Sequence, residues 1–349
     1  MNLIKIKSLI FYIFFCFVIS SLLLEVIFRL LPVSDTLSTQ NVNIQNPILR
    51  YQPNKIITRQ TGYNFQHIVK KKINNLGFFN DADFNDSDLN NHILIIGDSY
   101  VEALQVENKN TVTGLLNKNS KTLDKKVFSI GVSGSPLSQY LAFAEYAELN
   151  LKPLKYIFII ISDDFDESLI KYKNAPGFHY FDENFKLVRK DYSPSTLKKL
   201  ARKSAFIRYL HLDYKISARI SSLFTKKSIE KEKINKNKIL LSYKAIDNFN
   251  ENLQKIVNQK PVLFILDRDR KSIYNQSLEY KSYENEMYDY FENNCCLVQN
   301  FNTIDIQNSF KKNYKKNKKR FEFKNDFHWN ELGHKIVAEE IIKSGFLDK

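Results

Sequence analysis

The chain has 349 residues, of which 43% are hydrophobic and 13% aromatic, so it can bury a large core in one or two domains. Three cysteines, two of them adjacent at Cys295 and Cys296, exclude a disulfide framework. Neither the cysteines nor the six histidines are spaced as metal ligands, and nothing indicates another cofactor. The formal net charge is +14, to which a general abundance of lysine contributes without any anionic partner.

The N-terminal segment, residues 1–32, is typical of a membrane anchor. Residues 8–24 carry no charge, which is close to the roughly 20 apolar residues that cross a bilayer core. The alternative, a buried helix of a soluble protein, is disfavoured because the segment is apolar on all faces. Lys5 and Lys7 precede it and place the N-terminus in the cytoplasm, and no small-residue cleavage site follows. We expect a single-pass protein of the cell membrane whose main domain is extracytoplasmic, either periplasmic or on the outer face.

Residues 33–91 are polar and irregular, and they predict a stalk and a connecting segment. The short apolar run Ile93–Gly97 then predicts a strand that is buried on both faces. The spacing of apolar residues from Val101 to Leu116 predicts a helix, so Ser99 lies on a strand-to-helix turn. That turn suits a nucleophilic hydroxyl, although Asp98 or Ser99 could equally be the N-cap of the helix.

Strands and helices alternate through the rest of the chain, which is typical of a parallel sheet covered by helices on both faces. Further strands are predicted at Lys126–Ile130, Tyr156–Ile161, Pro261–Leu266 and Cys296–Val298, and helices at Leu137–Leu149 and Asn330–Ser344. The predicted fold class of residues 92–349 is therefore α/β, a doubly wound, flavodoxin-like three-layer parallel sheet.

A large insertion, at about residues 163–238, separates the third strand from the fourth. From Ser195 to Lys238 it contains thirteen Lys or Arg and three Asp or Glu, and Leu197–Ile220 has the spacing of an amphipathic helix. This basic stretch could be a solvated helix face, a lid over the active site, a patch for anionic glycan or a contact for acidic lipid headgroups. Nucleic acid does not fit the predicted side of the membrane. A second basic run, Lys311–Arg320, predicts a solvated loop.

Three polar motifs lie where the loops of such a fold meet. Gly97-Asp98-Ser99 ends the first strand, the segment 131–135 follows the second, and Asp326 and His328 precede the last helix. Because the carboxyl ends of parallel strands share one edge of the sheet, these segments could converge. A serine, a histidine and an aspartate that meet there are the groups of nucleophilic acyl transfer. Taken singly, His328 could be an ordinary loop histidine and Asp326 a helix cap.

In the order, strand context and spacing of these motifs, the chain resembles the SGNH hydrolases, also called GDSL-type esterases, over residues 93–342 with the insertion as a gap. The resemblance implies that Ser99 is the nucleophile, His328 the base and Asp326 its orienter. It also implies that the backbone N–H groups of Ser99 and Gly134 form two sides of an oxyanion hole. Many members place the aspartate three positions before the histidine, but the Asp-x-His-Trp pattern here is similar to that of SGNH-domain acetyltransferases of alginate-type systems.

One residue departs from the family pattern. The third block of the family usually supplies an asparagine whose side-chain N–H₂ completes the oxyanion hole, and Asp163 stands at that position here. An ionised carboxylate only accepts hydrogen bonds and repels an oxyanion. Asp163 could be protonated through burial, displaced from the site or a sign of weakened catalysis. Trp329, which follows the histidine, either walls the site or packs in the core.

The anchor and the stretch Asn74-Asn75-Leu76-Gly77 are similar to those of membrane-anchored members that modify surface polysaccharides. The resemblance thus implies a membrane-anchored esterase or O-acyltransferase that acts on acyl esters, acetyl in the first instance, of a cell-envelope polysaccharide. The two activities differ in whether water or a sugar hydroxyl attacks the acyl-enzyme. A transferase would need a further membrane protein as acyl donor. The alternative, motivated by Asp163, is a non-catalytic SGNH-fold component that binds glycan in an assembly complex.

Overall fold

The computed structural model describes residues 3–119, 125–224, 236–274, 283–295, 297–324 and 326–348. The chain divides into two compact units, which we describe separately. The first comprises residues 1–37, 57–70 and 194–229, and the second comprises residues 38–56, 71–193 and 230–349. Both units combine segments that are distant in the sequence. The anchor, stalk and main-domain boundaries at residues 32 and 91 stay a prediction.

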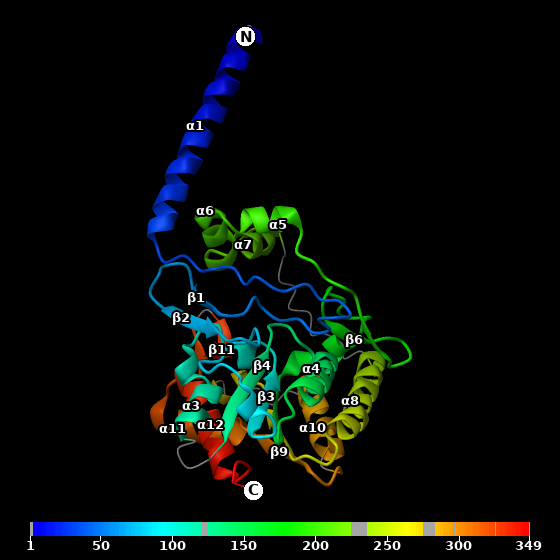
Figure 1. Cartoon of the computed structure of the whole chain (residues 1–349). Coiled ribbons are helices and arrows are strands. Elements are labelled where there is room, and N and C mark those ends of the chain that lie inside the picture. Colours follow the sequence, from blue (N-terminus) through cyan, green and yellow to red (C-terminus); the bar gives the residue numbers. More distant parts are fainter. Residues whose placement is uncertain are drawn as a thin grey trace. The chain divides into compact units, whose positions relative to one another are not determined.

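A five-stranded parallel sheet forms the centre of the second unit (Figure 1). Its strands are β3 (His92–Gly97), β4 (Lys126–Gly131), β5 (Lys155–Ile160), β8 (Val262–Leu266) and β9 (Phe301–Asp305). They pair in the order β4-β3-β5-β8-β9, which is 2-1-3-4-5 along the chain and confirms the predicted flavodoxin-like, doubly wound fold. Every residue of β3, β5 and β8 is buried, as expected for strands that are covered on both faces.

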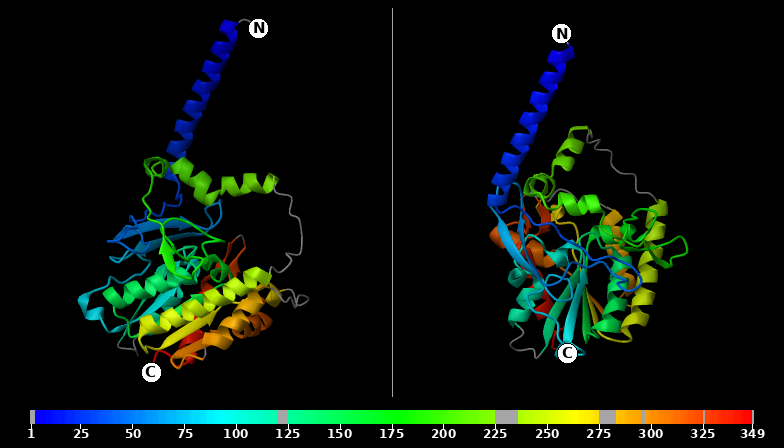
Figure 2. Two further views of the ribbon diagram at one scale, coloured as in Figure 1. Left: turned by 90° about the vertical axis from the view of Figure 1, so that its right-hand side faces the viewer. Right: turned by 45° about the horizontal axis from the view of Figure 1, so that its top comes forward.

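Helices cover the two faces of this sheet (Figures 1 and 2). On one side α4 (Leu137–Asn150) packs against α8 (Lys236–Val257), and α8 packs in turn against α10 (Tyr283–Cys295). On the other side α12 (Glu331–Lys343) packs against α3 (Val112–Asn119) and α11 (Gln307–Asn317). The smaller elements of this unit are α2 (Ser99–Glu102), α9 (Lys271–Tyr274), β6 (His179–Phe181), β7 (Leu187–Arg189), β10 (Glu322–Phe323) and β11 (Asp326–Trp329).

Two predicted helices are interrupted in the structure. The helix expected from Val101 to Leu116 is wrong, because α2 ends at Ala103, whose φ of 48° is left-handed, and α3 begins only at Val112. The amphipathic stretch Leu197–Ile220 is also not one helix. It forms α5 (Thr196–Ala201), α6 (Ala205–Arg208), a π-helical turn at Tyr209–Asp213 and α7 (Ile216–Phe224). The break after α5 has a local cause, since the Ser204 hydroxyl caps a new helix by accepting from the N–H of Ile207.

Two further predictions near the C-terminal end of the chain are wrong. The fifth strand is not Cys296–Val298, of which Cys296 lies outside the described residues. It is Phe301–Asp305, which is in register with β8. The basic run Lys311–Arg320 is mostly helical in α11 instead of a loop, because buried Phe310 gives the helix an apolar contact that outweighs its many lysines.

A buried lysine fastens the loop that follows α2. Lys71 is fully buried, and its Nζ donates to the backbone oxygens of Ala103 at 2.8 Å and Val106 at 2.6 Å. These carbonyls belong to the stretch where the predicted helix is interrupted. Lys71 therefore stabilises the chain reversal between α2 and α3, directly after the turn that contains Ser99.

The substitution Lys71→Met is expected to lower the free energy of unfolding by about 2–4 kcal/mol, because it leaves two buried carbonyls without a donor. Urea unfolding of the detergent-solubilised chain, followed by the fluorescence of its single tryptophan, measures this loss. The matched control is Lys72→Met, since Lys72 pairs with Asp83 near the surface and such pairs contribute less than about 1 kcal/mol. Equal losses in the two variants would contradict the assigned role of Lys71.

The first unit contains α1 (Leu3–Leu30), most of β1 (Lys55–Gln60), the first half of β2 (Ile68–Ile73), and helices α5 to α7. The segment Lys7–Leu30 of α1 is long and apolar enough to cross a membrane, and no residue of it is fully buried. The location of the α1 segment agrees with the predicted anchor of residues 1–32.

Candidate active site

The turn between β3 and α2 presents Ser99 at the carboxyl edge of the sheet. An added Cβ at Gly97 would lie 2.4 Å from the Val101 side chain, so this turn needs glycine. Asp98 is the N-cap of α2: its carboxylate accepts from the Tyr100 N–H at 2.9 Å and from the Ser99 hydroxyl at 2.8 Å. Of the two alternatives left open by the sequence, Asp98 is thus the cap, and Ser99 is the first residue of the helix.

His328 and Asp326 form a hydrogen-bonded pair on β11. Residues two apart in a strand project to the same face, which brings the two side chains together. The His328 Nδ1 donates to the Asp326 carboxylate, and the His328 backbone N–H donates to the same oxygen at 3.0 Å. Burial opposes ionisation of both groups, but their mutual bond and attraction lower the pKa of Asp326 to about 2 and raise the pKa of His328 above its usual 6.5.

Gln105 is a third member of this cluster, which the sequence did not reveal. Its side-chain nitrogen lies 3.1 Å from the Asp326 Oδ2 and 3.1 Å from the His328 Nδ1. Gln105 follows the left-handed residue Ala103, so the interruption of the predicted helix is what aims its amide at Asp326. The amide donates to the carboxylate oxygen that His328 leaves unused and so fixes the orientation of the carboxylate.

Arg270 and Tyr100 hold the backbone next to His328. The Arg270 guanidinium donates to the Tyr100 hydroxyl at 2.6 Å and to the Phe327 carbonyl at 2.8 Å. The Tyr100 hydroxyl also donates to this carbonyl at 3.0 Å, and its ring lies 5.1 Å from the His328 ring. Sequence position could have indicated Arg270, because it follows β8 at the same edge of the sheet as Ser99.

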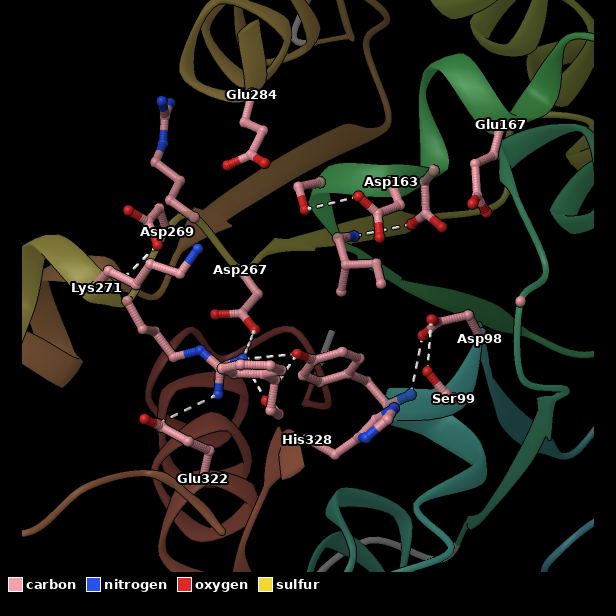
Figure 3. A pocket seen from close by; sticks show the side chains of 18 of the residues that line it. Asp98, Ser99, Asp163, Glu167, Asp267, Asp269, Lys271, Glu284, Glu322 and His328 are labelled. Atoms are coloured by element: carbon pink, nitrogen blue, oxygen red, sulfur yellow. Dashed lines mark hydrogen bonds and ion pairs between the residues drawn. The ribbon is translucent and has the colours of Figure 1, made fainter. Parts of the chain in front are cut away.

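Ser99 and His328 line one cavity of about 510 Å³ in the second unit (Figure 3). Its wall is formed by the loops after four strands of the sheet and by the segments next to β10 and β11. In this structure the Ser99 hydroxyl is turned to Asp98, and among the described residues no hydrogen bond joins it to His328. The charge of Asp98 nevertheless contributes to the raised pKa of His328, so the imidazole lies within electrostatic range of the serine turn.

The two candidate oxyanion residues, Gly134 and Asp163, also line this cavity. Gly134 has a φ of +79°, and its carbonyl accepts from the Nζ of Lys173 at 2.9 Å. Asp163 is exposed, and the Ser162 hydroxyl donates to it at 3.4 Å. Burial, which the sequence left open as a means of neutralising this carboxylate, is therefore absent at Asp163.

The buried carboxyl of this loop is the next residue, Asp164. It accepts from the Ile161 N–H at 2.8 Å and from the Tyr140 hydroxyl at 3.0 Å. Burial and the nearby charge of Asp98 raise the pKa of Asp164 well above its usual value. Asp164 thus ties the loop to the core, while Asp163 faces the solvent-filled cavity.

Trp329 packs in the core and is not part of the cavity wall. Its side chain is 1% exposed, and its Nε1 donates to the Asp267 carboxylate at 2.9 Å. Burial raises the pKa of Asp267 to about 6, although the charge of Arg270 opposes this shift. In the part of the chain that the structure describes, no group of three or more His, Cys, Asp or Glu side chains is arranged to hold a metal ion.

No protein-family model matches the chain, and comparison with curated proteins gives no match. Solved structures are similar to it at low identity. One is LAE5, an alpha/beta hydrolase from the metagenome of Lake Arreo, Spain, with 14% identity over 75% of this chain and 98% of that chain and a TM-score of 0.42. Another is a putative GDSL-like lipase from Parabacteroides merdae, with 11% identity over 74% and 97% and a TM-score of 0.43.

A third similar structure is a two-domain esterase active on acetylated mannans, with 12% identity over 75% of this chain and 50% of that chain and a TM-score of 0.40. The similar structures thus include a GDSL-like lipase, the group that the sequence motifs resemble. The assignment of the fold itself rests on the strand order and registers described above.

Proposed function

We propose that this protein is a membrane-anchored serine esterase or O-acyltransferase that acts on acyl esters, acetyl in the first instance, of a cell-envelope polysaccharide. One observation carries the proposal: Ser99 and His328, which is hydrogen-bonded to Asp326, line the same cavity at the carboxyl edge of a parallel sheet. The α1 segment supports membrane anchoring. The lysines before it support an extracytoplasmic position of the catalytic unit.

In the proposed reaction the Ser99 hydroxyl turns from Asp98 to His328, which accepts its proton through Nε2. The Ser99 oxygen attacks the ester carbonyl, and the backbone N–H groups of Ser99 and Gly134 stabilise the resulting oxyanion. His328 then returns the proton to the leaving oxygen of the acyl donor, which is the sugar oxygen in the case of the esterase, and the acyl group stays on Ser99. Asp326 stabilises the imidazolium that forms between these steps.

The second half of the reaction decides between the two activities. Water attack on the acyl-enzyme gives hydrolysis, whereas attack by a sugar hydroxyl gives transfer to that sugar. The His328 imidazole accepts the proton of the attacking group in either case. A transferase would take its acyl group from a second membrane protein, and the ratio of free acetate to acetylated sugar that is formed distinguishes the two activities.

The proposal is tested by incubating the full-length, detergent-solubilised protein with a fluorophosphonate and locating the adduct by peptide mass spectrometry. We expect a single adduct on Ser99, because only an activated serine attacks this reagent at an appreciable rate. Prior denaturation is the control and should abolish labelling. A folded protein that binds glycan but is not labelled would overturn the enzymatic proposal.

The second candidate function is a non-catalytic glycan-binding component of an assembly complex. The exposed Asp163 favours it, because the family resemblance implies an oxyanion donor at this position and an ionised carboxylate there would repel the transition state. Labelling of Ser99 together with turnover of an acetyl ester would exclude this alternative.

The substitution Asp163→Asn is expected to raise kcat for acetyl-ester hydrolysis by about 100-fold. It removes a repelling charge and adds an oxyanion donor, and one such donor usually contributes a rate factor of this size. The rate of p-nitrophenol release from p-nitrophenyl acetate measures it. Asp269→Asn is the matched control, because Asp269 lines the same cavity on the loop after β8, and its rate should change little. An unchanged rate in Asp163→Asn would show that this side chain does not face the oxyanion.

A further inference from the structure

A carboxylate near the end of the anchor helix, Glu25, pairs with Arg29 of the same helix at 2.7 Å and also holds a second helix. Glu25 lies inside the apolar segment Lys7–Leu30, where an unpaired charge would be costly. Its oxygens accept from the Ser204 hydroxyl at 2.7 Å and from the N–H groups of Ala205 at 3.1 Å and Phe206 at 3.0 Å. The N-terminus of α6 is thereby attached to the side of α1, next to which it lies in Figure 1.

Aromatic and ionic contacts extend this attachment along the chain after Ser204. Phe28 stacks on Phe206 at 5.4 Å and packs against Tyr209 at 4.3 Å between ring centroids. Arg208 pairs at 2.5 Å with Asp35, which lies in the segment that follows α1. Residues 204–209 are therefore fixed to the last two turns of the anchor and to the segment that follows it.

The length of the anchor sets the depth of this attachment. Twenty-four residues, from Lys7 to Leu30, make a helix of about 36 Å, which exceeds the roughly 30 Å of a bilayer core. Glu25 is 18 residues after Lys7, about 27 Å along the helix, so it and α6 lie near the outer boundary of the hydrocarbon core. If α6 belonged to a domain that tumbled freely outside the membrane, it would not stay at this depth.

Helices α5 to α7, which we call the interfacial helices, expose apolar side chains beside basic ones. Leu197 is 77% and Leu200 64% exposed on α5, and Ile207 and Ile220 are about half exposed on α6 and α7. Lys198, Lys199, Arg202 and Lys203 interleave with them. Apolar side chains together with lysines and arginines on short helices are the pattern of segments that lie in a membrane interface, where each basic residue gains about 1 kcal/mol from anionic lipid.

We propose that the interfacial helices bind the lipid surface that α1 crosses. In this arrangement the exposed apolar side chains contact the part of the acyl chains next to the headgroups, and these side chains are Leu197, Leu200, Ile207 and Ile220. The lysines and arginines reach the anionic headgroups. The occupant of this surface is a bilayer that contains anionic lipid. Attachment to Glu25 already restricts the helices to the membrane interface. Their binding to lipid therefore costs little further positional entropy. This proposal is independent of the catalytic one, since none of its residues lines the active-site cavity.

The single tryptophan of the chain allows a direct test. Trp329 is 1% exposed in the second unit, so the native protein gives a background signal. The full-length variant Leu200→Trp is reconstituted in vesicles of phosphatidylcholine and phosphatidylglycerol with brominated acyl chains. We expect bromine to quench roughly half of the fluorescence that the new tryptophan adds to the Trp329 background. The reason is that interfacial helices insert about 5–10 Å into the boundary between headgroups and acyl chains. The quenching should weaken in vesicles without the anionic lipid.

Leu149→Trp is the matched control, since Leu149 is 73% exposed on α4 of the second unit. Quenching of Leu200→Trp that does not exceed that of Leu149→Trp would overturn the proposal and leave a protein partner as the occupant. In the background of Leu200→Trp, the substitution Glu25→Ala should reduce the quenching, because it frees α6 from the anchor. Equal quenching with and without Glu25 would overturn the assigned role of this carboxylate.

Discussion

Replacement of Ser99 by alanine is expected to lower the rate of acetyl-ester hydrolysis on the order of 10⁶-fold. The reason is chemical, because alanine has no oxygen that can form the acyl-enzyme. The Asp98 carboxylate loses one hydrogen bond but keeps the Tyr100 N–H, so the turn should retain its conformation. Release of p-nitrophenol from p-nitrophenyl acetate and labelling by a fluorophosphonate measure the loss.

Ser162→Ala is the matched control for this experiment. Ser162 lines the same cavity, but its hydroxyl contacts only the exposed Asp163 among the hydrogen-bond partners found in the structure. We expect its rate to stay within a few-fold of that of the native protein, by analogy with other surface substitutions. Full activity in Ser99→Ala would assign the nucleophile elsewhere and remove the basis of the proposed mechanism.

The sheet could be predicted from sequence because its strands are short runs of apolar residues that are buried on both faces. Ile93–Gly97 and Pro261–Leu266 differ from β3 and β8 by a single residue at one end. The fifth strand could not be found in this way, because only Phe301 of β9 is buried and the strand is defined by its pairing with β8.

The pair of Asp326 and His328 could be predicted because the Asp-x-His-Trp pattern resembles that of a known family, although the strand β11 that carries both residues was not predicted. Gln105 could not be assigned to this pair, and sequence position places Arg270 only at the same edge of the sheet, since the contacts of both residues with the pair are long-range. Gln105 is placed by the chain reversal that Lys71 stabilises, and Arg270 by its bonds to Tyr100 and the Phe327 carbonyl. The side chains that position a reacting group are thus harder to recognise than the group itself.

The basic insertion shows a different limit of sequence analysis. Its helical periodicity was correct in kind, but the breaks at Ser204 and at Lys215, which has a φ of 53°, divide it into separate helices. The carboxylate that caps α6 comes from Glu25, about 180 residues earlier in the chain. In the sequence Glu25 only interrupts an apolar segment, and its role is apparent only once its partners are known.

The substitution Asp326→Asn is expected to lower kcat on the order of 10⁴-fold, because an asparagine amide can donate to His328 Nδ1 and so favour the wrong imidazole tautomer. It also removes the charge that stabilises the imidazolium. With the asparagine nitrogen beside His328 Nδ1, the asparagine oxygen still accepts from the amide of Gln105, whereas the backbone N–H of His328 loses its acceptor. Initial rates with p-nitrophenyl acetate measure the loss, with Asp269→Asn as control.

The pH profile separates this positioning role from a merely structural one. Only neutral His328 can accept the Ser99 proton, so kcat/KM should rise with pH through the pKa of His328, which the hydrogen bond and charge of Asp326 raise above 6.5. Asp326, with a pKa of about 2, stays ionised throughout this rise. In Asp326→Asn the rise should move to lower pH, because burial then acts on the imidazole without a compensating charge. An acid limb at the same pH in both proteins would show that the group titrating in catalysis is not His328.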